Sequence, residues 1–578
     1  MTAGLEDLPA KVLDRLVFFL STDKDHSQEV GSRIRRPHGF SPNADLIAFS
    51  STSKSLRKGI APYLFQTLSL VAKDGFSTLV EVKRLEWLAQ KGRGLLEYVR
   101  LGDVPRAGID VACECIKGMI NLENLTHCAF TPVSPRFVQA LSTLQHFEAF
   151  HSWFAGVESL PHLLPLANKL ASLILTANIR PPSHLDVWDL CPITVAANRR
   201  NQLPHDDRNV PTVREQAEAL VNSLAKLLFA TKDKLKIFGI NAQGIYHTRT
   251  GETTDTYALA WLSHLFQSLR DLNGGEYPVF PQLEGVRVAY CDAKCVGMTH
   301  LLKTSPKIRD LEIAERPGAQ LPVVKAPLQK LEWLYILADD LVPVAPFVRR
   351  VTDGSLLRWL TLSGVQQRDI GSIFERDLPN LRELRLICYG TTPFELRYFQ
   401  RIVKGCPRLV SFDLTGQFYD CEAPQIFAAL RPLARLRHFA FDHPWEKPRN
   451  FPFPSPDGRT IRTSRNQDFR IIGVVRGSIN AEIKKRIGQD IQAVTPVYHK
   501  RFASIAKKHP SLRTISWTAT DEVTWDWTFI RDGDLDPGKL KKLQHHPEID
   551  IDVGGPGDLN PGAAGIFLTM RAGEAGHG

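Results

Sequence analysis

The sequence lacks the features of a membrane or secreted protein. Its strongest apolar run near the N-terminus, VLDRLVFFL, is shorter than the about eighteen residues that a membrane-spanning helix needs and contains Asp14 and Arg15. The opening segment MTAGLEDLPA has no cationic stretch of a signal peptide. Nine cysteines scattered over 578 residues, an odd number, are typical of reduced thiols rather than of a disulfide framework. We therefore expect an intracellular protein, cytoplasmic and/or nuclear.

The sequence also has few of the residue patterns that carry chemistry. Cys113 and Cys115, like Cys291 and Cys295, lack the second Cys pair or the His partners of a zinc site, so we interpret them as buried thiols. No GxSxG nucleophile elbow is present, which leaves open only a catalytic triad assembled from distant residues. We expect a chain that is not an enzyme, with no catalytic residue, no metal and no cofactor.

The net charge is concentrated in one segment. Lys and Arg number 72 against 62 Asp and Glu, a formal charge of +10. Residues 446–514 contain 15 basic and 5 acidic residues, so this segment accounts for the whole excess. We interpret it as a solvated insertion. The alternative is a binding arm for nucleic acid or a phosphoprotein, but no zinc-finger spacing, RNA-recognition signature or run of stacking aromatics accompanies the charge.

A short word of apolar residues recurs along the chain. Its pattern, apolar-x-x-apolar-x-apolar, is the strand core of a leucine-rich repeat. The instances are Leu96/Val99/Leu101, Leu170/Leu173/Leu175, Leu235/Phe238/Ile240, Leu283/Val286/Val288, Ile308/Leu311/Ile313, Leu331/Leu334/Ile336, Leu357/Leu360/Leu362, Leu381/Leu384/Leu386, Leu409/Phe412/Leu414, Leu436/Phe439/Phe441 and Leu512/Ile515/Trp517, with weaker copies starting at Leu122 and Leu144. From Leu283 to Leu436 the starting positions advance by 25, 23, 26, 24, 28 and 27 residues, close to the period of this repeat class.

Each repeat is predicted to be a strand followed by a helix. The alternation within a word indicates a strand with one buried face, and Leu396, Phe399 and Ile402, in the stretch after one word, have helical spacing. A single unit cannot bury its apolar face, so neighbouring units must stack. We therefore predict an α/β solenoid, with parallel strands on the inner face and helices outside.

The repeats set the expected domain organisation. The solenoid covers residues 71–530, with insertions near 178–212 and 446–495 where loop-like and Pro-rich sequence interrupts the period. Residues 531–578 form a C-terminal extension whose Gly-rich end indicates partial disorder.

Residues between the last two apolar positions of a word should face the inner surface, because side chains alternate along a strand. They include Arg100, Glu148, Arg287, Glu312, Tyr335, Thr361, Arg385 and Asp413. Tyr and Arg are enriched among binding hot spots, which puts Arg287, Tyr335 and Arg385 first. With Asp413 they are our candidate substrate-binding residues, although any solvated strand face would show a mixed polar lining.

Residues 5–70 differ from the repeats and carry the pattern of three short helices. The motifs are Leu8-Pro9, Val12-Leu13 and Leu16, then Asp45-Leu46, Phe49-Ser50, Ser53-Lys54 and Leu56-Arg57, closing with Pro62, Leu64-Phe65 and Leu68. This segment resembles an F-box, in the form common in fungal proteins that join it to leucine-rich repeats. It departs from the family in having Lys11 where an acidic residue is usual and in the insertion 21–44 between the first two helices.

The resemblance implies a non-catalytic substrate-recognition subunit of a cullin ubiquitin ligase. The F-box would bind the Skp-type adaptor, while the repeats would hold a protein substrate. The implied adaptor-binding residues are Leu8, Pro9, Val12, Leu13, Leu16, Leu46, Phe49 and Leu56. Two alternatives stay open: the helices only cap the apolar end of the solenoid, or the chain is a leucine-rich-repeat scaffold with no ligase role.

Overall fold

The computed structural model divides the chain into two units, Met1–Leu331 (unit 1) and Glu332–Gly578 (unit 2), which are described separately. The residues it describes are 67–70, 96–102, 108–128, 133–155, 159–178, 212–242, 255–315, 320–338, 342–388, 395–415, 423–442, 509–520, 523–531, 540–553 and 566–571, with shorter pieces between them. The predicted adaptor-binding residues, the insertion 21–44 and nearly all of both repeat insertions lie outside these residues.

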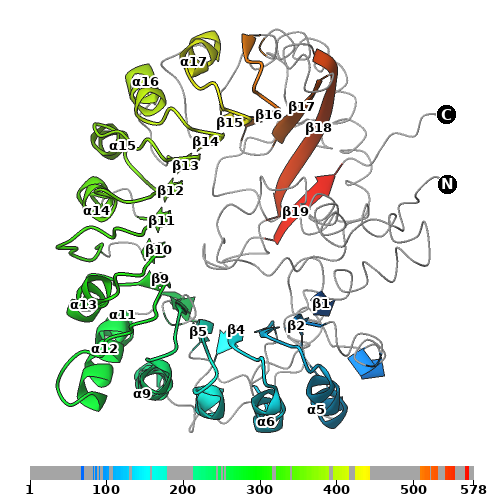
Figure 1. The fold of residues 1–578 in the computed structure, drawn as a ribbon, viewed down its shortest axis with the longest axis vertical. Helices are drawn as coiled ribbons and strands as arrows, with labels where there is room; N and C mark the ends of the chain where they lie inside the picture. The colour runs from blue at the N-terminus through cyan, green and yellow to red at the C-terminus, as the bar shows by residue number, and fades with distance from the viewer. Residues whose placement is uncertain are drawn as a thin grey trace, which may run out of the picture. The chain divides into compact units, whose positions relative to one another are not determined.

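Unit 1 contains a parallel sheet with one strand from each repeat (Figure 1). Its strands, which pair in this order, are β1 (Thr67–Leu70), β2 (Tyr98–Leu101), β3 (Asn124–His127), β4 (Ala149–Ala155), β5 (Ser172–Asn178), β6 (Ile237–Ala242), β9 (Gly285–Cys291) and β10 (Asp310–Glu315). A separate antiparallel pair joins β7 (His247–Thr248) to β8 (Gly251–Glu252). Because consecutive repeats pair with each other, the sheet has the connectivity of a solenoid.

Helices cover one side of the unit 1 strands (Figure 1). They are α5 (Ile109–Gly118), α6 (Pro135–Thr143), α7 (Leu160–Leu163), the 3₁₀ helix η3 (Leu164–Leu166), α9 (Val213–Thr231), α11 (Thr256–Leu259), α12 (Trp261–Leu272) and α13 (Val296–Thr304). The longest, α9, begins with a capping box between Thr212 and Glu215 and buries Leu220, Leu224 and Leu228 on one face. This stripe anchors the helix against the sheet.

Unit 2 continues the same design and then changes it. Its parallel strands are β11 (Trp333–Leu337), β12 (Trp359–Ser363), β13 (Glu383–Ile387), β14 (Ser411–Thr415), β15 (His438–Asp442) and β16 (Thr514–Thr520), with helices α14 (Ala345–Val351), α15 (Gln367–Ile373), α16 (Leu396–Gly405) and α17 (Ala423–Leu430). Antiparallel strands β17 (Val523–Arg531), β18 (Leu540–Val553) and β19 (Ile566–Arg571) follow. These three strands were not predicted from the sequence, and β18 and β19 lie in the C-terminal extension.

In unit 2 the strand pairing confirms the predicted repeat register. Leu360 lies opposite both Leu334 and Leu384, and Phe412 lies opposite Phe439. All five side chains are at most 1% exposed. A slip of one residue would turn every one of them to the other face of the sheet, so burial and register agree. Both units are therefore α/β solenoids of leucine-rich-repeat type.

An aromatic cluster forms the core of the last unit 2 repeats. Phe399 of α16 stacks on Phe412 with ring centroids 5.5 Å apart, and Phe427 of α17 meets Phe439 edge-on at 5.8 Å. Phe439 and Phe441 stack at 5.0 Å. Such pairs contribute about 0.5–1.5 kcal/mol each beyond the burial of their area. The cluster thus ties two helices to two strands from neighbouring repeats.

The structure adds a strand at the start of the solenoid. β1 pairs in parallel with β2, and Leu68 and Leu70 lie opposite Val99 and Leu101. The F-box resemblance extends to Leu68, yet this residue belongs to the first repeat strand. The signal was present in the sequence, because Phe65, Leu68 and Leu70 have the spacing of the repeat word.

Candidate functional site

The candidate site is the inner face, which we define as the strand face opposite the helices. In unit 1 the register aligns one row of its residues, His151, Ile174, Gly239, Arg287 and Glu312. In unit 2 it aligns Tyr335, Thr361, Arg385 and Asp413. All four candidate substrate-binding residues therefore occupy the row that the sequence predicted for them.

Arg287 in unit 1 faces an acidic neighbour on the next strand. Its Nε lies 3.5 Å from Oε2 of Glu312, and the two side chains are only 15% and 21% exposed. Burial raises the pKa of Glu312, while the charge of Arg287 opposes that rise. A partner that binds Arg287 through a carboxylate would therefore compete with Glu312.

His151 lies in the same row as Arg287. Its Nε2 is 3.0 Å from Oγ of Ser172 on the adjacent strand β5. Burial, with a smaller effect from the charge of Arg287, lowers the pKa of His151 to about 4. In β6, the strand between β5 and β9, the residue that belongs to this row is Gly239. His151 is therefore neutral at physiological pH, and it contributes a hydrogen bond rather than a charge to the inner face.

This shift predicts a pH dependence of stability. The unfolded chain protonates this imidazole near its ordinary pKa of 6.5 and the folded chain only near 4, so between these values the unfolded state binds more protons. The free energy of unfolding should fall by about 1–2 kcal/mol through His151 as the pH drops from 7 to 5. Denaturant unfolding of the His151→Gln variant should show a correspondingly smaller fall. Parallel pH profiles for the two proteins would contradict the assignment.

The unit 2 row combines an ion pair with aromatic side chains. Arg385 Nε lies 3.0 Å from Oδ2 of Asp413, across β13 and β14. Tyr335 stacks on Trp333, with ring centroids 6.2 Å apart and planes inclined by 13°. Trp333 lies opposite Trp359 and is 1% exposed. The half-buried Tyr335 is thus held in place by the buried indole beside it.

The two tryptophans were missed as inner-face residues. Trp333 and Trp359 stand two positions before the row residues Tyr335 and Thr361, so strand alternation places them on the same face. The sequence contained this information, because residues two positions before the row residue point to the same side of a strand. The prediction considered one position per strand, whereas a strand of five residues presents up to three to each side.

Glu148 is a wrong prediction for the inner row. In β4 the residue aligned with Thr126 and Ile174 is His151, not Glu148. Glu148 instead precedes the strand, and its carbonyl accepts hydrogen bonds from the N–H groups of Ala171 and Ser172. The word of this one repeat therefore lies three residues later than was predicted from the sequence.

The described residues contain few groups suited to catalysis. They include no cluster of three or more His, Cys, Asp or Glu side chains that could hold a metal ion. Burial raises the pKa of Cys295 to about 11 and that of Cys388 to about 12, so both thiols stay protonated at neutral pH. Across the same residues, no helix combines the length and hydropathy needed to cross a membrane.

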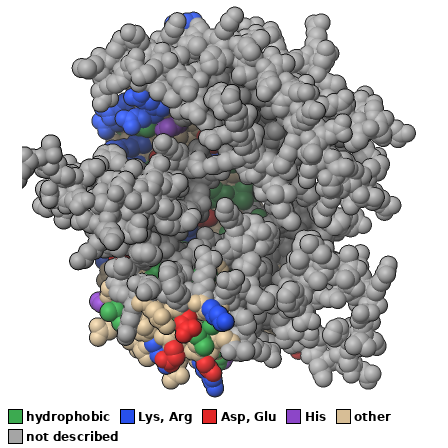
Figure 2. Space-filling model, turned by 90° about the vertical axis from the view of Figure 1, so that its right-hand side faces the viewer, with side chains coloured by type: hydrophobic (Ala, Val, Ile, Leu, Met, Phe, Trp, Pro, Cys, Tyr) green, Lys and Arg blue, Asp and Glu red, His purple; other side chains and the backbone are tan. Residues whose placement is uncertain are grey.

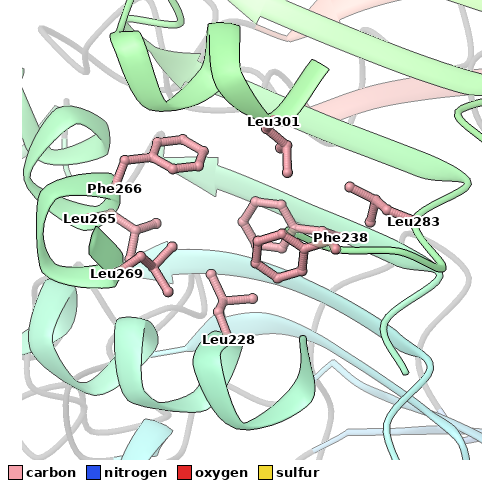
Figure 3. Close-up of a pocket in the computed structure, with 8 residues that line it drawn as sticks. Leu228, Phe238, Leu265, Phe266, Leu269, Leu283 and Leu301 are labelled. Carbon is pink, nitrogen blue, oxygen red and sulfur yellow. The ribbon is translucent and has the colours of Figure 1, made fainter. Parts of the chain in front are cut away.

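A cavity in unit 1 is also unsuited to a ligand. It lies among α9, α12, α13 and the strands, lined by Leu228, Phe238, Leu265, Phe266, Leu269, Phe280, Leu283 and Leu301 (Figure 3). Its volume is about 10 Å³, and every lining side chain is apolar. A space of this size holds at most one water and offers that water no polar partner. We interpret it as a packing gap between helices and sheet.

Comparison with known proteins yields no relative by sequence. No family model and no curated protein matches the chain. Solved structures with detectable similarity include the yeast Rad7 and Elc1 complex (11% identity, TM-score 0.31, 71% of this chain and 87% of that chain) and a Leptospira interrogans leucine-rich-repeat protein (12%, 0.27, 70% and 95%). An internalin from Listeria monocytogenes is similar at 10% identity and a TM-score of 0.25, over 62% of this chain and 82% of that chain. Likeness this distant carries no functional argument, and the fold assignment stands on the strand register and the buried repeat leucines of this chain.

Proposed function

We propose that the chain is a non-catalytic protein-interaction scaffold whose repeat surface binds a protein. The observation that carries the proposal is the continuous inner row of each unit, whose residues repeat at the strand spacing of about 4.8 Å and are all polar or aromatic in unit 2 and partly so in unit 1. Such a row presents an extended surface, which suits a protein better than a metabolite. In unit 2 the partner would contact Tyr335, Arg385 and Asp413, and in unit 1 Arg287.

We further propose that this scaffold is the substrate-recognition subunit of a cullin-type ubiquitin ligase. The support is the F-box resemblance of residues 5–70, whose last four residues form the first repeat strand β1. Leu8, Val12 and Leu13 would lie among the adaptor contacts. The mechanism would be positional, because holding a substrate near a ligase-bound ubiquitin carrier raises its effective concentration without any bond chemistry from this chain.

The test is complex formation between the purified full chain and a Skp-type adaptor. We expect the two to co-elute in size-exclusion chromatography, and the double variant Leu8→Asp with Val12→Asp to lose the complex. The matched control makes the same two substitutions at exposed positions, Leu356→Asp with Val323→Asp, which are 50% and 54% exposed and should leave the complex intact. Full-strength binding by a correctly folded Leu8/Val12 variant would contradict the adaptor contacts.

Two other functions would give different results. A scaffold without a ligase role would co-purify from cells with a partner but with neither adaptor nor cullin. A nucleic-acid or phosphoprotein binder acting through 446–514, the segment that carries the whole net charge, would lose its ligand on deletion of 448–490. Its affinity for nucleic acid would also fall steeply with rising salt.

A further inference from the structure

Five arginines gather at the edge of unit 2 where the strands begin; we call this set the arginine edge. Its members are Arg382, Arg408, Arg435, Arg437 and Arg513. Arg382, Arg437 and Arg513 follow the first apolar residue of their repeat words, while Arg408 and Arg435 precede it. The N–H of Arg513 donates to the carbonyl of Arg437 at 2.7 Å, so these two lie one strand spacing apart. Figure 2 shows a patch of Lys and Arg side chains on the face that it presents.

Among the described residues, the arginine edge has none of the acidic partners that other arginines in unit 2 have. On the strand before Arg382, Arg358 occupies the same word position and lies 3.8 Å from Glu332. Arg385, on the inner row, pairs with Asp413. None of the five edge arginines forms a salt bridge with a described residue; Arg408 donates only to the amide oxygen of Asn380, at 3.3 Å. Four of the five are exposed and Arg513 is half-buried.

This clustering opposes folding rather than helping it. Like charges directly opposite each other on neighbouring strands are destabilising, and Arg437 and Arg513 are so placed. Two further exposed cations, Arg431 and Lys508, lie close to His509, and their charges add to burial in lowering the pKa of that imidazole. The positive charge therefore extends beyond the arginine edge, and no contact among the described residues explains it.

We propose that the arginine edge binds a short acidic segment, rich in Asp and Glu, of a protein partner. Guanidinium groups bind carboxylates in bidentate geometry. The patch spans the starts of about four neighbouring strands, or roughly 15 Å, which matches four or five residues of an extended peptide. Nucleic-acid binders commonly contact about 6–10 phosphates, which needs a longer surface. The inserted residues 443–504 are an unsuitable occupant, because they contain 12 basic and 5 acidic residues.

The proposal goes beyond the proposed function, since it names a second surface and the chemistry of its partner. The test measures fluorescence anisotropy of the full chain with three probes: a labelled dodecapeptide of alternating Asp and Glu, its Asn/Gln counterpart, and a DNA duplex. We expect the acidic peptide to bind more tightly than the other two at low salt. The double variant Arg435→Glu with Arg437→Glu should weaken that binding at least about tenfold.

The matched control reverses two exposed charges on the outer helix of the same unit, Arg401→Glu with Lys404→Glu. It changes the net charge equally and should alter peptide affinity less than about twofold. Equal losses in both variants, undiminished binding in the edge variant, or tighter binding of the duplex would each overturn the proposal. Because adaptor co-elution is measured separately, failure here and failure of the ligase role are distinguishable.

Discussion

Replacing Gly364 with alanine should destabilise unit 2 by about 3–5 kcal/mol. Gly364 follows β12 with φ of +74°, a left-handed conformation that residues with a side chain adopt at a cost. A Cβ at this position would also lie 1.8 Å from the carbonyl oxygen of Ala338, a backbone atom held by the neighbouring strand. Because neither chain can move without disturbing the strand pairing, the clash cannot be relieved cheaply. Denaturant unfolding of purified protein measures the effect.

Gly274 supplies a control that separates the two causes. Its φ is +73°, nearly the same, but a Cβ there would meet no atom within 4 Å. Gly274→Ala should therefore cost only the conformational part, about 1–2 kcal/mol. Equal losses for the two variants would show that the close approach of Gly364 to Ala338 does not exist in solution.

Replacing Leu384 with alanine should cost about 2–5 kcal/mol. Leu384 is 1% exposed and lies between Leu360 and Phe412 on the strands to either side, so truncation opens a cavity that close-packed repeats cannot fill. Loss of one repeat should weaken its neighbours, since solenoid units stabilise one another. The measurement is the midpoint and slope of equilibrium unfolding in urea.

Two further substitutions serve as controls for the Leu384→Ala result. Leu356→Ala removes the same atoms from a side chain that is 50% exposed and should change stability by less than about 0.5 kcal/mol. Arg385→Ala removes a partly exposed ion pair with Asp413 and should cost no more than about 1 kcal/mol. If Arg385→Ala proved as costly as Leu384→Ala, the assignment of buried and inner faces would be wrong.

Local pattern was enough for most of the repeat array. A strand with one buried face needs apolar residues two apart, and a helix needs them three or four apart, so Leu381, Leu384 and Leu386 specify a strand before any contact is known. The same alternation placed Arg287, Tyr335, Arg385 and Asp413 on the inner row. The F-box assignment of residues 5–70 stays a prediction, because its helices lie outside the described residues.

Local pattern was ambiguous where apolar residues were too many. At the start of β4 and just before it, Leu144, Phe147 and Phe150 are all buried, so two words three residues apart share the first spacing, although the later word ends in the buried Ser152. Pairing with β3 and β5 selects the later word, because it alone brings Phe150 opposite Leu125 and Leu173. Register between strands is a non-local quantity, and the placement of Glu148 failed for that reason.

The sequence by itself determined the repeat period, the α/β solenoid and which face of most repeat strands is buried, because these depend on residues within one repeat. Only the tertiary structure decided which charges of separate repeats meet. Arg385 and Asp413 are 28 positions apart in sequence yet 3.0 Å apart in space, while Arg437 and Arg513, 76 positions apart, are brought to neighbouring strands and form no salt bridge with any residue that the structure describes. Charges on separate repeats interact only once stacking places them at the strand spacing, so their pairing cannot be read from either repeat alone.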